Sequence, residues 1–150
     1  MSFKEKMTWV YGVVTLAVGV AYLAVVGSML DGTPVSEIDY QWWLLGAIGV
    51  SIAATIIGTI GVAIATAISA EITGEGSADD IDREDERDRG IDKRGELVGY
   101  YVTSVGVVAA LALAMLREDQ FWIANTLYVG CLLGALAGTI AKIVFYRRGF

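Results

Sequence analysis

The sequence predicts an all-α integral membrane protein in which four transmembrane helices form an antiparallel bundle, with residues 1–150 as a single membrane domain. Hydrophobic residues make up 55% of the chain, and the mean hydropathy is +0.59. Apolar runs of about 18 residues or more indicate membrane-spanning helices. The chain has four such runs, and almost all of its charged residues lie outside them; the runs are 8–30, 41–70, 97–116 and 121–146.

The first span opens at a membrane interface, because Trp9 lies where an aromatic belt is expected. The span is longer than the apolar core of a signal peptide, so we expect it to be retained as a helix. Gly12 and Gly19 are seven residues apart and share one helix face. This spacing predicts close packing against another helix.

The second span follows a connection, 31–40, in which Pro34 predicts a turn. About 30 residues of helix would be roughly 45 Å long, more than a hydrocarbon core of roughly 30 Å. We therefore expect the helix to tilt or to project from the membrane. Small residues line one side of it and predict close helix contacts there; they are Gly49, Ala53, Ala54, Gly58, Gly61 and Ala65.

The central segment, 71–96, carries most of the acidic excess behind the net charge of −6. From Asp79 onward its spacing predicts a charged loop helix that leads into the third span. Gly90 and Gly95 each cost about 1 kcal/mol relative to alanine in a helix, which predicts fraying or a hinge there. Mixed charges with one apolar residue are typical of an interface that selects its partner. The candidate partner-binding residues are Arg83, Arg87, Asp88, Ile91 and Arg94.

The third and fourth spans are separated by residues 117–120 alone, which predicts a tight antiparallel hairpin. The fourth span has glycines at intervals of four on one face, a pattern that favours close helix packing; they are Gly130, Gly134 and Gly138. Two partners fit this stripe. One is the small-residue side of the second span at Ala54 and Gly58, which we favour, and the other is the same stripe in a second copy.

Lysine and arginine counts predict the orientation in the plasma membrane. The N-terminus, the central segment and the C-terminus hold ten of the eleven Lys and Arg residues. All three should therefore be cytoplasmic. The acidity of the chain argues against a nucleic-acid partner. It suits a cytoplasm of high ionic strength, and a halophilic, archaeal source is one hypothesis.

The residue types argue against an enzyme and against a metal or cofactor site. The chain has no histidine, and its four spans contain no Asp or Glu, so intramembrane acid–base chemistry lacks its usual imidazole and carboxylate groups. Asp80-x-Asp82-x-Glu84 starts like a calcium-binding loop, but Asp85 occupies the position that requires glycine. Cys131 lies within the glycine stripe, and we expect it to be a small buried residue.

Asn125 and Thr126 are the clustered polar pair of the fourth span, and they suggest a second function. In an oligomer they could line a pore, which would make the protein a channel or a small-solute permease. In the other reading, they satisfy each other or the backbone by hydrogen bonds.

The central segment also resembles a known family. Asp85-Glu86-Arg87-Asp88-x-x-Ile91-x-x-Arg94, followed by Gly99-Tyr100-Tyr101-Val102 at the start of a span, is similar to the DUF2178-type family of small prokaryotic membrane proteins of unknown function. The resemblance implies four spans and no established activity. It also implies a sensing or sequestering role, because some members are encoded beside helix-turn-helix regulators. The leading hypothesis is therefore a non-enzymatic membrane protein that docks a cytoplasmic protein or its own copies through the charged segment.

Overall fold

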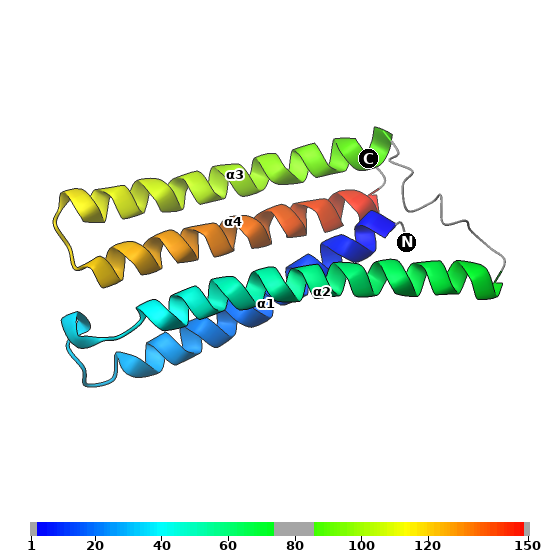
Figure 1. Ribbon diagram of the computed structural model, residues 1–150. Coiled ribbons are helices and arrows are strands. Elements are labelled where there is room, and N and C mark those ends of the chain that lie inside the picture. The colour runs from blue at the N-terminus through cyan, green and yellow to red at the C-terminus, as the bar shows by residue number, and fades with distance from the viewer. Residues whose placement is uncertain (1–2, 74–85, 149–150) are drawn as a thin grey trace.

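The computed structural model describes residues 3–73 and 86–148, and the side chains of 69–73 are outside that description. Within these residues the chain is all-α, and each of its long helices is apolar enough to cross a membrane (Figure 1). The prediction of four candidate membrane spans is confirmed. The elements are α1 (Phe3–Met29), the short 3-10 helix η1 (Val35–Glu37), α2 (Gln41–Thr73), α3 (Glu86–Met115) and α4 (Gln120–Arg148).

The four helices run antiparallel, with both termini at one end of the molecule and the two short connections at the other (Figure 1). The helix α4 is central, because it packs against α3 on one side and against α1 on another. Among the described helices, α2 packs extensively along α1 alone. The arrangement is thus two hairpins joined through α1 and α4, and α2 and α3 form its outer members.

The turn between α3 and α4 confirms the predicted hairpin. Arg117 has a left-handed backbone conformation, with a φ of 59°, and the backbone N–H of Glu118 donates to the carbonyl of Leu113 at 3.0 Å. This geometry is a Schellman C-cap. Asp119 then caps α4, because its Oδ1 accepts a hydrogen bond of 2.8 Å from the backbone N–H of Phe121.

The glycine stripe of α4 packs against α3, so both partners expected from the sequence are wrong for it. A Cβ added at Gly130 would lie 2.7 Å from the Cα of Gly106, and one added at Gly99 would lie 2.8 Å from the carbonyl oxygen of Gly134. Backbone therefore meets backbone along this interface, as small residues permit. The stripe has this partner because α3 carries its own row of small residues, at Gly95, Gly99, Thr103 and Gly106.

The close packing predicted for Gly12 and Gly19 is confirmed, and its partner is α4. A Cβ at Gly12 would lie 2.7 Å from a methyl carbon of Thr139, and one at Gly19 would meet Leu132. In α2, Gly58 faces Val10 of α1 and Ala54 is half-buried, while the remaining small residues of the predicted ridge are exposed. The exposed ones are Gly49, Ala53, Gly61 and Ala65.

The described part of the charged segment is helical and leads directly into the third span, as predicted, but it has no break at its glycines. α3 begins at Glu86 and continues without interruption through Gly90 and Gly95 into its apolar part, so the expected fraying or hinge is absent there. Gly95 is buried, and a Cβ there would lie 3.0 Å from the carbonyl oxygen of Gly138. Close packing against α4 therefore explains this glycine. The remainder of the predicted loop helix, 79–85, lies outside the described residues.

A buried aromatic cluster closes the end of the molecule that holds the short connections. Tyr40 and Phe121 pack edge to face, with ring centroids 5.1 Å apart, and both side chains are buried. Burial raises the pKa of Tyr40, and the carboxylate of Asp119 adds to the effect. The opposite end, where the termini lie, is polar and charged.

Candidate functional site

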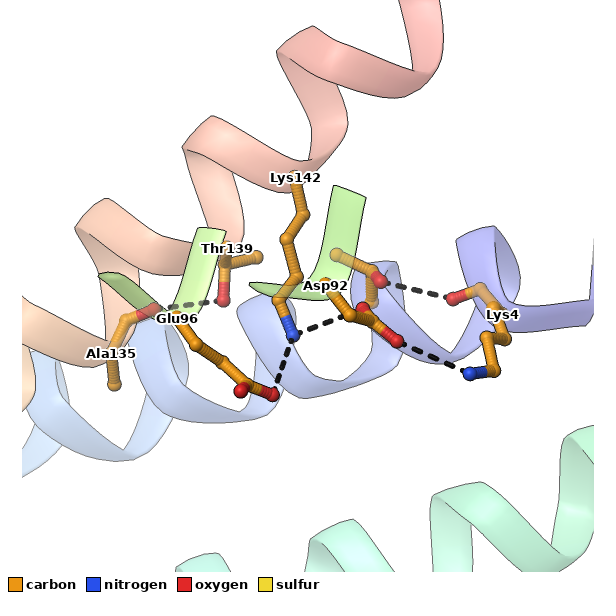
Figure 2. Close-up of polar contacts among 7 residues, drawn as sticks. Lys4, Asp92, Glu96, Ala135, Thr139 and Lys142 are labelled. Atoms are coloured by element: carbon orange, nitrogen blue, oxygen red, sulfur yellow. Dashed lines mark hydrogen bonds and ion pairs between the residues drawn. The ribbon is translucent and has the colours of Figure 1, made fainter. Parts of the chain in front are cut away.

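Four charged side chains meet at the end that holds the termini, and they join three helices (Figure 2). Lys4 of α1 donates a hydrogen bond from Nζ to Asp92 Oδ2 at 3.2 Å. Lys142 Nζ of α4 lies 3.1 Å from Asp92 Oδ1 and 3.6 Å from Glu96 Oε1, both acids being on α3. The charges alternate in sign along the row Lys4, Asp92, Lys142, Glu96, which we call the charged row.

Three members of the charged row are shielded from solvent and one is open to it. The side chains of Lys4, Asp92 and Lys142 are 30%, 27% and 20% exposed, whereas that of Glu96 is 71% exposed. Ion pairs that are partly withdrawn from water are screened less by salt than surface pairs. Asp92 therefore links the two lysines, and the Glu96 carboxylate keeps room for a further partner.

The charged row lines one end of a cleft with a volume of about 770 Å³. Residues of α1, α3 and α4 form most of its lining, and α2 contributes Thr59. The volume is within the range of small-molecule sites, roughly 300 to 1,000 Å³. Much of the remaining lining is small or hydroxyl-bearing, with Thr8, Gly99, Thr103, Gly134, Gly138 and Thr139.

Two threonine hydroxyls of the cleft are already held by their own helices (Figure 2). Thr8 Oγ1 donates to the carbonyl of Lys4 at 2.9 Å, and Thr139 Oγ1 donates to the carbonyl of Ala135 at 2.8 Å. Each hydroxyl uses its one proton in this bond and keeps an oxygen that can accept. Both side chains are buried, so these oxygens are fixed polar points in a small-residue wall.

Cys131 also lines the cleft, and its side chain is exposed. The expectation that it is buried within the glycine stripe is wrong. The stripe residues on either side of it turn toward α3, while Cys131 lies one position further round the helix and faces the open space. The cleft therefore has a thiol in its wall.

The structure separates the residues predicted to bind a partner. Arg87 and Arg94 are exposed, Asp88 is half-buried, and Ile91 is 2% exposed, so the rest of the chain covers its side chain. Arg83 lies outside the described residues. The outward half of this first part of α3 is mainly basic, and we call it the basic face; its members Arg87, Arg89, Lys93 and Arg94 are exposed beside Glu86 and Glu96.

The residues proposed for a pore lie at the opposite end of the molecule. Asn125 and Thr126 line a second groove, of about 730 Å³, with mostly apolar walls. The Asn125 amide is engaged on both sides: its Oδ1 accepts from the hydroxyl of Tyr22 at 2.7 Å, and its Nδ2 donates to the carbonyl of Phe121 at 2.8 Å. This geometry ties α1 to α4 and uses the amide for structure.

Sequence reasoning missed the charged row, although one signal for it was present. Lys142 interrupts the apolar run of the fourth span one turn before its end. An ionisable residue inside a span is costly and usually has a partner. The two acids, Asp92 and Glu96, lie one turn apart near the start of α3, on the helix that forms a hairpin with α4. Lys4 comes from a distant part of the sequence.

Known protein families, curated proteins and solved structures give no match to this chain. In the part of the chain that the structure describes, no group of three His, Cys, Asp or Glu side chains is placed to hold a metal ion. Function is therefore inferred from the charged row, the cleft and the basic face themselves.

Proposed function

We propose that this chain is a non-enzymatic, multi-pass protein of the plasma membrane that docks an acidic cytoplasmic protein through the basic face of α3. The observation that carries the proposal is the contrast in charge. The whole chain has a net charge of −6, yet four exposed basic side chains gather on one half of the first turns of α3. Such a local field attracts and orients a partner of opposite sign.

The distribution of Lys and Arg supports a cytoplasmic location for this face. The connections at the opposite end of the molecule, 30–40 and 116–119, contain Arg117 as their single basic residue. Short connections that are rich in basic residues are retained on the cytoplasmic side of the membrane. The basic face, the N-terminal residues and the C-terminal residues then share the cytoplasm.

The length of the exposed helix favours a protein partner over the lipid surface. The stretch from Glu86 to Glu96 precedes the third apolar run, and at 1.5 Å per residue it extends about 16 Å. The headgroup layer adds roughly 6 Å on each side of the hydrocarbon core. A helix that leaves the membrane near its normal therefore presents its first turns, with Arg87 and Arg89, to water beyond the headgroups. Arg94, three residues before the apolar run, lies at the level of the headgroups.

Arg87 and Arg94 are the side chains that we expect to contribute most. They are seven residues apart, which places them on one flank of the helix two turns apart. A guanidinium can bind a carboxylate through two parallel hydrogen bonds, so this pair can fix the register of an acidic partner. Ile91, which the chain itself covers, holds this part of α3 in position. The role agrees with the one implied by the resemblance to the DUF2178-type family, which itself stays a prediction.

Site-specific photo-crosslinking in native membranes tests the proposal. A photoreactive amino acid at Lys93 should capture an acidic protein. Reversing both charges, with Arg87→Glu and Arg94→Glu, should reduce the yield at least about tenfold, because two charged contacts become repulsive. Arg117→Glu, at the opposite end, is the matched control and should leave the yield unchanged. A crosslinking yield that is unchanged by the charge reversal would overturn the proposal. Binding of the basic face to vesicles in proportion to their content of anionic lipid would also overturn it.

A further inference from the structure

We infer that the cleft behind the charged row binds a zwitterionic phospholipid whose headgroup ends in a primary ammonium. This inference does not rest on the proposed function, because it concerns a different surface. It rests on the alternation of charge in the row, with two ammonium groups and two carboxylates. A phosphate beside an ammonium is the headgroup pattern that complements such a row.

The cleft opens toward the membrane. α1 and α3 both pack on α4, but α3 makes little contact with either α1 or α2. The space is therefore bounded by α4, bordered by Thr59 of α2, and open sideways next to α3. Met7 and Tyr11 of α1 line this space together with Gly99 and Thr103 of α3. A flexible acyl chain fits a groove of this kind because the small residues of its floor leave room for dispersion contacts.

The charged row lies at the depth of lipid headgroups. Lys4 precedes the first apolar run, Asp92 and Glu96 immediately precede the third, and Lys142 lies one turn inside the end of the fourth. Long lysine side chains extend from such positions to the interface. A lipid in the cleft would therefore place its headgroup at the charged row and its tail along the glycines. A water-soluble ligand would leave the glycine-lined part of the cleft unfilled.

The chemistry of the row distinguishes among headgroups. The Nζ groups of Lys4 and Lys142 can donate to a phosphate, since each ammonium carries three donors. Glu96 is 71% exposed and can accept from a primary ammonium. A choline group has no N–H to donate to Glu96. A lipid with a net negative charge would face Asp92 and Glu96 without a cation of its own, so both alternatives bind less well.

Native mass spectrometry of the full chain from nanodiscs tests this inference. The nanodiscs contain equal amounts of ethanolamine, choline and glycerol phospholipids with identical acyl chains. We expect the ethanolamine lipid to be retained at least about tenfold over each of the others, the value of one charge-assisted hydrogen bond. Glu96→Gln should lower the preference over choline several-fold, because the amide oxygen still accepts a hydrogen bond but no longer carries a charge. Glu118→Gln, an exposed acid at the opposite end, is the matched control and should keep it.

The site is located by Cys131, the single cysteine of the chain. Its alkylation should be slower in ethanolamine nanodiscs than in choline nanodiscs, and Cys131→Phe should lower retention of the ethanolamine lipid because the ring fills the cleft. Circular dichroism confirms that each variant is folded. Equal retention of the three lipids, a preference for the anionic lipid, or a preference that Glu96→Gln leaves unchanged would each overturn the inference. Binding of free phosphoethanolamine without lipid retention would overturn it too.

Discussion

Lys142 Nζ lies 3.1 Å from Asp92 Oδ1, so the charged side chain inside the apolar run of α4 meets a carboxylate at the start of α3. Asp92 also accepts from Lys4 of α1. One carboxylate therefore holds the polar ends of three helices together, at the place where they leave the membrane.

Asp92→Asn should lower the free energy of unfolding by about 1 to 2 kcal/mol, between the values for exposed and buried ion pairs. The reason is that the variant leaves Lys142 with its longer contact to Glu96 and leaves Lys4 beside a neutral amide. Denaturant unfolding in detergent measures the change. Asp39→Asn, an exposed acid in the connection before α2, should change stability by less than about 0.5 kcal/mol. Equal effects of the two substitutions would mean that the charged row does not stabilise the fold.

Gly130→Ala should destabilise the protein by about 1 to 3 kcal/mol through overpacking. The added methyl group would meet the backbone of Gly106, which cannot rotate away. Thermal unfolding of the monomer in detergent gives the measurement. Gly49→Ala is the control, because no other part of the described chain lies within 4 Å of its Cβ position. Loss of a crosslinkable dimer with unchanged monomer stability would instead assign the stripe to contacts between copies.

Arg117→Gly should stabilise the α3–α4 hairpin by about 0.5 to 1 kcal/mol, because glycine adopts a positive φ without the clash of a Cβ. Arg117→Ala keeps the Cβ and should bring no such gain. Comparing the two unfolding midpoints separates backbone strain from the loss of the guanidinium. Similar gains in both variants would show that the charge, and not the backbone, was the unfavourable feature.

Much of this fold follows from the sequence, because lipid requires long apolar helices and the sequence shows where they lie. Each expected span falls within an observed helix or differs from it by a residue or two at the ends, as 121–146 does within Gln120–Arg148. The short connection at 117–120 also makes α3 and α4 neighbours. These features depend on residues close together in the chain, and local patterns specify them.

The helix partners could not be read in the same way. Small residues allow close approach to any helix, so the stripe at Gly134 matched the ridge of α2 as well as it matched α3. The row of small residues on α3 makes α3 the packing partner of the stripe. That row was not recognised from the sequence, because Gly95 within it was interpreted as a hinge. The charged row was hidden for a related reason: Lys4 and Asp92 are 88 residues apart, and no spacing rule connects them.

Asn125→Leu should destabilise the protein by about 1 to 3 kcal/mol, because the buried hydroxyl of Tyr22 loses its acceptor. Thr126→Val, a neighbouring change of similar polarity, is the control and should have a smaller effect. The same variants examine the pore hypothesis in liposomes. We expect the wild-type protein to carry no ion flux, and a flux that disappears in Asn125→Leu would establish a channel or permease.

Cysteine labelling tests the orientation on which the proposed function depends. In a Cys131→Ala background, Lys93→Cys should react with an impermeant reagent from the cytoplasm, and Ser36→Cys should react from outside. Both positions are exposed in the structure. Reaction of both from the same side would contradict the topology, and reaction from the reversed sides would place the basic face outside the cell.

The central position of α4 has a consequence for biogenesis. Synthesis proceeds from the N-terminus, so α1, α2 and α3 enter the membrane before the helix that joins them exists. Gly12 of α1 finds its contact at Thr139, more than a hundred residues later in translation. Until then the cleft faces of α1 and α3 have lipid as their neighbour, and the α1–α2 hairpin must persist as an insertion intermediate. The tertiary structure is completed in a single late step, when α4 inserts and packs between α1 and α3, which are already in the bilayer.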